Sequence, residues 1–173
     1  YISADFVYPV TSLPIKNGVI GINPDGSIHA VLKAEEAVNI KNIKHYKGVL
    51  VPGFINTHCH LELSHMKGLI AEHTGLPKFI KQILAQRQYP EAEIISAMEN
   101  ADREMYENGI VAVGDISNLL ISKSVKENSK IYYHTFINVL GFNRPAEPII
   151  EAGLKLKEAF LPLKATVVPH APY

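Results

Sequence analysis

The sequence lacks the features that would point to a nucleic acid or a membrane as partner. Its 17 basic and 17 acidic residues give a formal net charge of zero, so the electrostatic footprint of a nucleic-acid-binding protein is missing. No apolar run approaches the length of a membrane span, and the first residues do not follow the charged-then-apolar pattern of a secretory signal. The composition therefore predicts a soluble protein that binds a small polar molecule.

Cysteine is almost absent as well, because Cys59 is the only one. A single cysteine cannot form an internal disulfide, which agrees with the reducing conditions of the cytoplasm. Cys59 lies between His58 and His60, and in a strand its side chain points to the face opposite theirs. We therefore expect a buried structural thiol at Cys59 rather than a metal ligand or a nucleophile.

The two histidines that flank Cys59 are the most informative residues of the chain. They follow a nearly continuous apolar run, 48–55, which is typical of a strand buried on both faces in a parallel sheet. Residues two apart in a strand project to one face, so the two imidazoles can converge on a divalent metal. With eight histidines in the chain, this spacing alone arises easily by chance. Its place at the end of a strand, where barrel enzymes hold their catalytic groups, favours a metal site.

The chain changes character near residue 48. Residues 1–48 contain short strand-like runs and a turn signal at 23–26, which indicate part of a small β-sandwich domain. Residues 49–173 alternate apolar strand runs with helical patterns, the rhythm of βα units around a parallel sheet. The expected strands are 1–8, 18–22, 28–32, 48–55, 110–116, 131–140 and 165–168, with 33–46 as a further strand or a connector. The expected helices begin at Pro77 and cover 91–108, 118–127 and 148–160.

These elements predict an α/β fold, the N-terminal part of a (β/α)8 TIM barrel that follows the β-sandwich strands. A closed barrel needs eight βα units and typically about 250 residues, whereas about four units are present here. The chain also begins at Tyr1 rather than at methionine. We expect it to be the first half of a longer protein, to require the missing C-terminal half-barrel, and to be inactive by itself.

Two motifs at strand ends resemble the amidohydrolase superfamily. The segment Pro-Gly-Phe-Ile-Asn-Thr-His-Cys-His, which ends at His60, is similar to the signature that opens the catalytic barrel of these enzymes. The segment His-Ala-Pro-Tyr, which begins at His170, is similar to the His-x-Pro-Tyr element that the deaminase branch carries after strand four. Together the motifs resemble the mononuclear aminohydrolases, a branch that contains cytosine deaminase-like enzymes, adenosyl-type deaminases and chlorohydrolases.

The resemblance implies a metal-dependent hydrolase that deaminates an aminated, nucleoside- or base-like heterocycle by means of a metal-activated hydroxide. It implies one divalent metal, zinc or alternatively iron, because imidazole and carboxylate ligands suit both. His58 and His60 are then two of the metal ligands. His170 is implied to contact the substrate, with a histidine satisfied by backbone groups as the alternative. The other ligands and proton carriers of the resembled enzymes lie beyond Tyr173, so no catalytic residue is assigned within this chain.

Other polar residues have weaker indications. Glu62 is implied to contact the substrate, because deaminases of modified nucleosides look similar in carrying His-Leu-Glu here; solvation or helix capping is the alternative. Asp115 ends the second barrel strand and is expected to orient a loop by hydrogen bonding rather than to take part in the chemistry. His134 lies in the middle of a strand and is expected to be a buried histidine satisfied within the core. Three further histidines are expected at the surface: His29, His45 and His73.

Three other functions stay open. A chlorohydrolase acting on triazine rings shares nearly all of this machinery. A binuclear cyclic amidohydrolase of the dihydroorotase or hydantoinase type needs a carboxylated lysine at the C-terminal end of strand four, whereas Lys164 lies at the N-terminal end of that strand. A non-catalytic scaffold relative commonly loses its ligand histidines, and this chain keeps both. A homo-oligomer is compatible with each of these functions.

Overall fold

A computed structural model of the chain describes residues 1–141 and 143–170. The chain folds as two compact units, Tyr1–Pro52 and Gly53–Tyr173, so the division falls after Pro52 where the sequence suggested residue 48. No helix in the described part of the chain is both long enough and apolar enough to cross a membrane.

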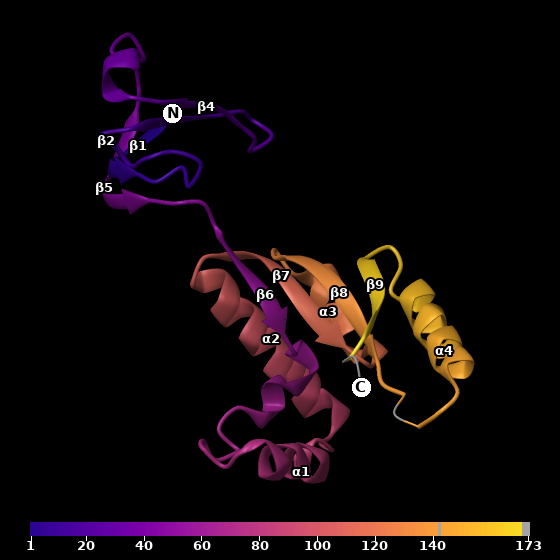
Figure 1. Cartoon of the computed structure of the whole chain (residues 1–173). Helices are drawn as coiled ribbons and strands as arrows, with labels where there is room; N and C mark the ends of the chain where they lie inside the picture. Colours follow the sequence, from indigo (N-terminus) through magenta and orange to yellow (C-terminus); the bar gives the residue numbers. More distant parts are fainter. Residues whose placement is uncertain (142, 171–173) are drawn as a thin grey trace. The chain divides into compact units, whose positions relative to one another are not determined.

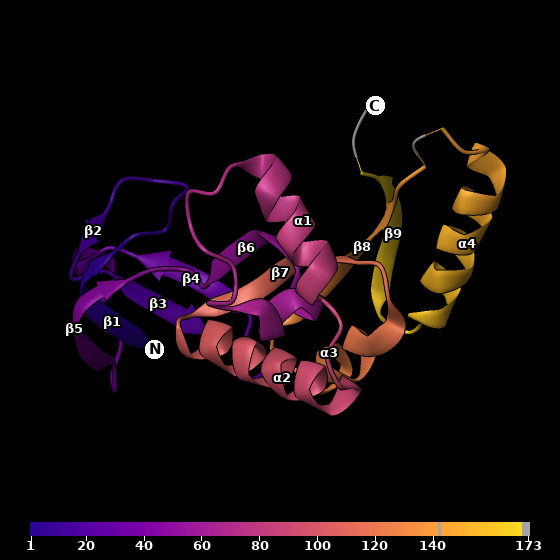
Figure 2. The same cartoon turned by 90° about the horizontal axis from the view of Figure 1, so that it is seen from below.

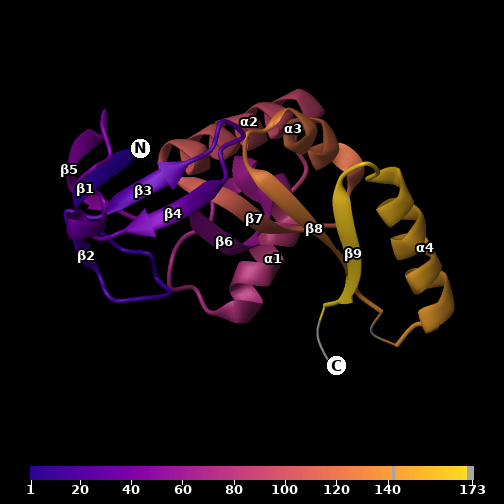
Figure 3. The same ribbon diagram turned by 90° about the horizontal axis from the view of Figure 1, so that it is seen from above.

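The first unit is a five-stranded sheet built around β1 (Ile2–Val7). On one side β1 pairs antiparallel with β2 (Ile15–Lys16) and β3 (Val19–Ile22), and β3 continues to β4 (Ile28–Leu32). On the other side β1 pairs parallel with β5 (Lys44–Leu50). Figure 3 shows β3 and β4 running in opposite directions as a hairpin. The antiparallel strands agree with the β-sandwich strands expected from the sequence.

The expected single strand 48–55 is wrong, because the run belongs to two different sheets. Its first part ends β5 at Leu50, and its last part begins β6 at Phe54. Pro52 lies between them and has no N–H to donate to a strand neighbour, which explains the break. The apolar run therefore contains the end of one strand, a connecting segment and the start of another strand. Hydrophobicity alone does not show where the first strand ends.

The second unit is a parallel sheet in the order β6-β7-β8-β9, each strand lying beside the one that precedes it in the chain (Figure 1). The strands are β6 (Phe54–Cys59), β7 (Ile110–Ser117), β8 (Tyr132–Val139) and β9 (Lys164–Pro169). The connections contain η2 (Leu61–Met66), α1 (Leu76–Gln86), α2 (Glu91–Glu107), η3 (Leu120–Ser122), α3 (Lys123–Asn128) and α4 (Ala146–Ala159). Four successive parallel strands with helical crossovers are what the first half of a (β/α)8 barrel requires.

The core of this unit lies on the face of the sheet that the helices cover. In Figure 2, α2 and α3 lie along that face and α4 runs beside β9. Side chains on β7 and β8 alternate, so that one set is buried against the helices and the other set faces away from them. The buried cluster contains Leu61, Met98, Val113, Val125, Ile131 and Tyr133.

The outer strands β6 and β9 each have one neighbour in this sheet. Phe54 and Ile55 at the start of β6 are 56% and 66% exposed. No residue of β6 is fully buried, so the expectation that the first barrel strand is buried on both faces is wrong for this chain. An open strand edge with exposed apolar side chains is prone to pair with another chain.

Candidate metal and substrate site

The two histidines of the sequence motif lie at the C-terminal end of β6. His58 is in the strand, and His60 follows its last residue and precedes η2. The ring centroids of His58 and His60 are 5.2 Å apart, with an angle of 65° between the ring planes. The two imidazoles are therefore neighbours, as the spacing predicts.

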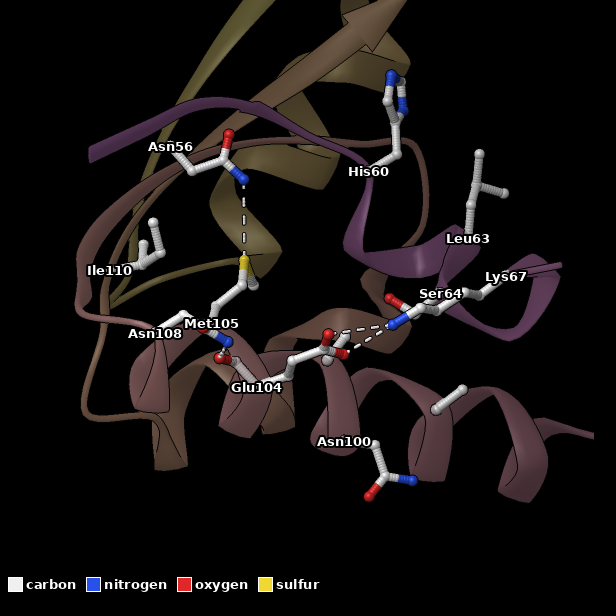
Figure 4. Close-up of a pocket in the computed structure, with 12 residues that line it drawn as sticks. Asn56, His60, Leu63, Ser64, Lys67, Asn100, Glu104, Met105, Asn108 and Ile110 are labelled. Carbon is white, nitrogen blue, oxygen red and sulfur yellow. Dashed lines mark hydrogen bonds and ion pairs between the residues drawn. The ribbon is translucent and has the colours of Figure 1, made fainter. Parts of the chain in front are cut away.

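A bulge in β6 sets the direction of these side chains. Asn56 pairs with Val113 and Cys59 pairs with Asp115, so β6 has two residues between these pairs where β7 has only Gly114. An extra residue in one strand reverses the side-chain alternation beyond it. Asn56 accordingly points toward α2 while the ring of His60 points away from it (Figure 4). His58 lies in this bulge and His60 follows the end of the strand, so the two-residue rule of a regular strand does not by itself explain why their rings are neighbours.

The bulge is held by a side chain of its own strand. The carboxamide oxygen Oδ1 of Asn56 accepts a hydrogen bond from the backbone N–H of His58 at 3.2 Å, and Nδ2 of Asn56 lies 3.8 Å from Sδ of Met105 on α2. A residue in a bulge does not form the regular backbone hydrogen bonds between strands. A polar side chain that accepts a hydrogen bond from the backbone of such a residue therefore stabilises the bulge. Asn56 therefore helps to place His58.

We expect Gly114→Ala to destabilise the protein by about 1–3 kcal/mol, the usual cost of overpacking. A Cβ at position 114 would lie 3.0 Å from the carbonyl oxygen of Thr57 and 3.0 Å from Cε2 of Phe136. The backbone oxygen belongs to the bulge and cannot turn away as a side chain can. Urea unfolding of the two proteins measures the difference. An unchanged unfolding midpoint would show that the bulge can shift at no cost.

Cys59 points into the core, on the side away from the two histidines. It packs against the buried cluster that contains Leu61 and Met98. Burial raises the pKa of the Cys59 thiol to about 12, and the negative charge of Asp115 adds to this rise. A protonated thiol in apolar surroundings is neither a nucleophile nor a metal ligand, which agrees with the structural role expected from the sequence.

His60 lies in an environment that favours its neutral form. Burial lowers the pKa of His60, the nearby His58 and His170 lower it further, and only Asp115 opposes them. The neutral imidazole is the form that binds a metal.

His170 lies just past β9, and the rest of its motif, residues 171–173, lies outside the described residues. Its backbone N–H donates to the carbonyl oxygen of Val139 at 3.0 Å, and its Nδ1 lies 2.8 Å from Nδ2 of Asn138. Because an amide nitrogen only donates, Nδ1 of His170 accepts in this arrangement. Nε2 is then the ring nitrogen left to contact a substrate, and the substrate contact stays a prediction.

Glu62 is buried rather than solvated, with 5% of its surface exposed. Its Oε2 accepts hydrogen bonds from the backbone N–H groups of Asn118 and Leu119, at 3.1 and 3.2 Å, in the loop that leads into η3. Burial raises the pKa of the Glu62 carboxyl, and the two N–H donors oppose that rise. These two hydrogen bonds support the alternative in which Glu62 caps the segment that leads into η3. A substrate contact of Glu62 stays a prediction.

Asp115 orients a loop by hydrogen bonding, as expected. It is completely buried, and its Oδ1 accepts from the backbone N–H of Leu61 at 2.7 Å. Its Oδ2 accepts from the hydroxyl of Ser117 at 2.8 Å and forms an ion pair with Nζ of Lys126 at 2.6 Å. Nζ of Lys126 also donates to Oγ of Ser117 and Oγ1 of Thr135, at 3.0 and 2.9 Å. All of these groups are buried.

The sequence did not predict that Lys126 is buried and paired with Asp115. It lies on α3, in a polar segment whose pattern indicates a solvated helix, and lysine is almost never fully buried unless it is paired. Burial lowers the pKa of the Lys126 ammonium, and the carboxylate of Asp115 opposes this. No local signal marks such a lysine, because its partner lies in a different strand.

Five further histidines are not part of the candidate site. Both ring nitrogens of His65 are buried without a hydrogen-bond partner among the described residues, whereas the other four are exposed or hydrogen-bonded. His134 is half-buried on β8, where its Nε2 forms a 2.9 Å hydrogen bond with Oγ1 of Thr166 on β9, so the expected full burial is wrong. His45 is exposed, and its ring bonds Oγ of Ser3 at 2.8 Å. His29 and His73 are also exposed, as expected.

Two curated proteins similar to this chain are deaminases, although no family model matches the chain. It is 30% identical to an adenosine deaminase of Helicobacter pylori over 129 residues, which are 72% of this chain and 31% of that protein. It is 27% identical to a 5'-deoxyadenosine deaminase of Methanococcoides burtonii over 117 residues, 65% of this chain and 26% of that protein. The chain therefore spans less than a third of these two relatives.

Solved structures agree in fold. An aminofutalosine deaminase of Helicobacter pylori, in complex with methylthio-coformycin, superposes with a TM-score of 0.77 at 25% identity and covers 99% of this chain and 44% of its own. A zinc complex of atrazine chlorohydrolase from Arthrobacter aurescens gives a TM-score of 0.73 at 17% identity, over 98% of this chain and 46% of that one. The resemblance to the amidohydrolase superfamily is confirmed. The fold is that of the N-terminal part of a TIM barrel.

The residues of the chain fit half of an amidohydrolase metal shell. Relatives of known structure, an adenosine deaminase from Xanthomonas campestris and the chlorohydrolase, contain zinc. Two adjacent imidazoles suit this metal, which takes four ligands in a tetrahedron. Among the described residues, no group of three or more histidine, cysteine, aspartate or glutamate side chains is placed to hold a metal. His58 and His60 are thus a predicted pair of ligands that needs others to complete the shell.

A hollow of about 640 Å³ lies between β6, η2 and α2 (Figure 4). Nζ of Lys67 forms an ion pair with Oε2 of Glu104 at 2.9 Å at its wall. His60 is one of the residues that line this hollow, and its ring points away from α2 (Figure 4). Most of the lining residues belong to α2 and η2, whereas the functional groups of TIM barrels lie at the C-terminal ends of the strands, so the hollow itself is not assigned as the candidate site.

Proposed function

We propose that the whole protein to which this chain belongs is a metal-dependent hydrolase that deaminates an aminated heterocycle of the nucleoside or base kind. The observation that carries the proposal is the pair of adjacent imidazoles, His58 and His60, at the C-terminal end of the first barrel strand. Zinc is the metal proposed, with iron as the alternative. Homologous deaminases and the confirmed fold support the reading.

The residues of the chain have separate proposed roles. His58 and His60 hold the metal through neutral ring nitrogens. When bound, the metal supplies Lewis-acid activation of water. His170, fixed through Nδ1 by Asn138, offers its Nε2–H to a ring nitrogen or exocyclic group of the substrate. Both curated relatives are deaminases, which favours C–N hydrolysis over the dechlorination of triazines. A cytoplasmic location and a homo-oligomer stay predictions.

The test uses the whole protein, loaded with zinc and assayed for ammonia release from purine nucleosides, 5'-modified adenosines, free purines and pyrimidines. We expect turnover of at least one of these classes. His58→Ala and His60→Ala should each lose bound zinc and lower the turnover by about a thousandfold or more, because the activation of water depends on the metal. His73→Ala, at an exposed position, is the matched control.

Two results would count against this function. Release of chloride from a chlorotriazine without release of ammonia from any aminated ring would support the chlorohydrolase instead. Full zinc content in both histidine variants would show that the metal is held elsewhere.

A separate prediction concerns His170→Ala in the same protein. We expect kcat/KM to fall by about ten- to a hundredfold, the scale of one lost hydrogen bond to a polarised group, while the zinc content stays near that of the wild type. Metal analysis and steady-state kinetics on one preparation measure both quantities. Loss of zinc in this variant would show that His170 is a ligand and not a substrate contact.

A further inference from the structure

Two loops at the C-terminal ends of β6 and β7 are joined by reciprocal hydrogen bonds. Asp115 of β7 accepts from the backbone N–H of Leu61, the residue after His60. In the other direction, Glu62 accepts from the backbone N–H groups of Asn118 and Leu119 after β7. Each loop thus supplies a carboxylate to the backbone of the other, an arrangement equivalent to a capping box between two segments.

The Asp115 side of this arrangement is fixed in place. Its carboxylate is completely buried and bonded to Lys126 and Ser117. A buried carboxylate that gave up such partners would lose several kcal/mol, so Asp115 does not swing away from Leu61. The side chain of Leu61 is itself fully buried in the core cluster. The peptide that follows His60 is therefore held at both its backbone and its side chain.

The Glu62 side holds the same peptide from its other end. Glu62 is the second residue after His60, and its Oε2 is tied to the neighbouring loop through two backbone donors. Breaking these bonds would leave the buried carboxylate of Glu62 without these two donors, at a cost of about 1–3 kcal/mol. With both carboxylates in place, the backbone from His60 to Glu62 has little freedom to rotate.

We propose that Asp115 and Glu62 form a carboxylate clamp that positions His60 for metal binding. The inference rests on the proposed metal site at His58 and His60. It assigns Glu62 a positioning role rather than a substrate contact, since the carboxylate oxygen that the structure engages is directed at the backbone of the next loop. Groups that orient a metal ligand are typically worth about 10–100-fold in metal affinity.

Three variants of Glu62 in the whole protein test the clamp by zinc affinity, measured by competition with a chromophoric chelator. Glu62→Gln keeps the length and one acceptor oxygen with two lone pairs, so its Kd for zinc should stay within about threefold of wild type. Glu62→Asp keeps the charge but is one methylene too short to reach both N–H groups. Its Kd, and that of Glu62→Ala, should rise by about 10–100-fold.

The order of the variants separates the clamp from a substrate ion pair. If the carboxylate instead paired with a charged substrate group, Glu62→Gln would raise KM most and Glu62→Asp would raise it least. The zinc affinity would not change in either variant. Wild-type zinc affinity in both Glu62→Asp and Glu62→Ala would overturn the clamp, whatever the thermal stability of these variants. Hydrogen exchange of the Asn118 and Leu119 amides, expected to be faster in Glu62→Ala, reports whether the contact was broken.

Two controls complete the design. Glu104→Ala removes an exposed carboxylate that also contacts the η2 region, through Lys67, but has no bond to the backbone after His60. Its zinc affinity should match the wild type. His58→Ala tests the premise: if it left the zinc affinity unchanged, the proposed metal site would fail, and this result is distinct from a failure of the clamp.

Discussion

Replacing Lys126 by alanine is expected to lower the free energy of unfolding by about 3–5 kcal/mol, the scale found when one partner of a buried ion pair is removed. Nζ of Lys126 lies 2.6 Å from Oδ2 of Asp115, and both side chains are completely buried. The replacement leaves the Asp115 carboxylate in the core without its cation, and it also removes the donor to Ser117 and Thr135. Urea unfolding of the whole protein measures the loss.

An exposed pair of similar geometry provides the control. Nζ of Lys155 lies 2.7 Å from Oε1 of Glu151 on α4, with 72% and 65% of these side chains exposed. Lys155→Ala is expected to cost less than about 1 kcal/mol, because water solvates the remaining carboxylate. Equal losses in the two lysine variants would show that burial does not determine the effect, and would contradict the structural argument.

A double variant tests the coupling itself. Lys126→Ala combined with Asp115→Ala should destabilise the protein by less than the sum of the two single replacements, since the second change removes the charge that the first left without a partner. Strict additivity would mean that the two groups do not interact as the 2.6 Å distance indicates.

The sequence predicted many individual strands and helices in both units, because these signals are local; the expected strand 28–32, for example, coincides with β4. A strand or helix pattern needs only the residues of one segment, and the expected ranges 131–140 and 91–108 agree closely with β8 and α2. The histidine pair could also be predicted from the sequence, because the motif consists of two residues and the strand that precedes them. Glu62, which follows this motif, could be predicted as a candidate, with helix capping as an alternative. Its burial could not be predicted from the sequence.

The sequence failed where contacts between segments decide the structure. The break at Pro52 depends on the chain leaving one sheet and entering another, and the bulge at Thr57 and His58 depends on the register of β6 against β7. The burial of Lys126 depends on Asp115, which lies in another element. Each of these features needs information on which segments are neighbours, and a periodic pattern in one segment contains none.

The 173-residue chain by itself is expected to bind zinc weakly and to show no deaminase turnover. Four-ligand zinc sites in small peptides provide about 10–16 kcal/mol of binding free energy. Two of four ligands should provide roughly half, about 5–8 kcal/mol, which corresponds to a Kd between about 1 µM and 0.2 mM. His58 and His60 are the two imidazoles concerned, and no larger cluster of ligands occurs in the described part of the chain.

Calorimetric zinc titration of the chain and of the whole protein measures the difference, which should reach several orders of magnitude in Kd. The double variant His58→Ala and His60→Ala is expected to remove the weak binding, whereas His73→Ala should leave it intact. The free edges of β6 and β9 should also make the isolated chain associate as its concentration rises, because unpaired strand edges recruit other strands. A monodisperse chain with one tightly bound zinc and measurable ammonia release would contradict this prediction, because two imidazoles would then suffice for the complete site.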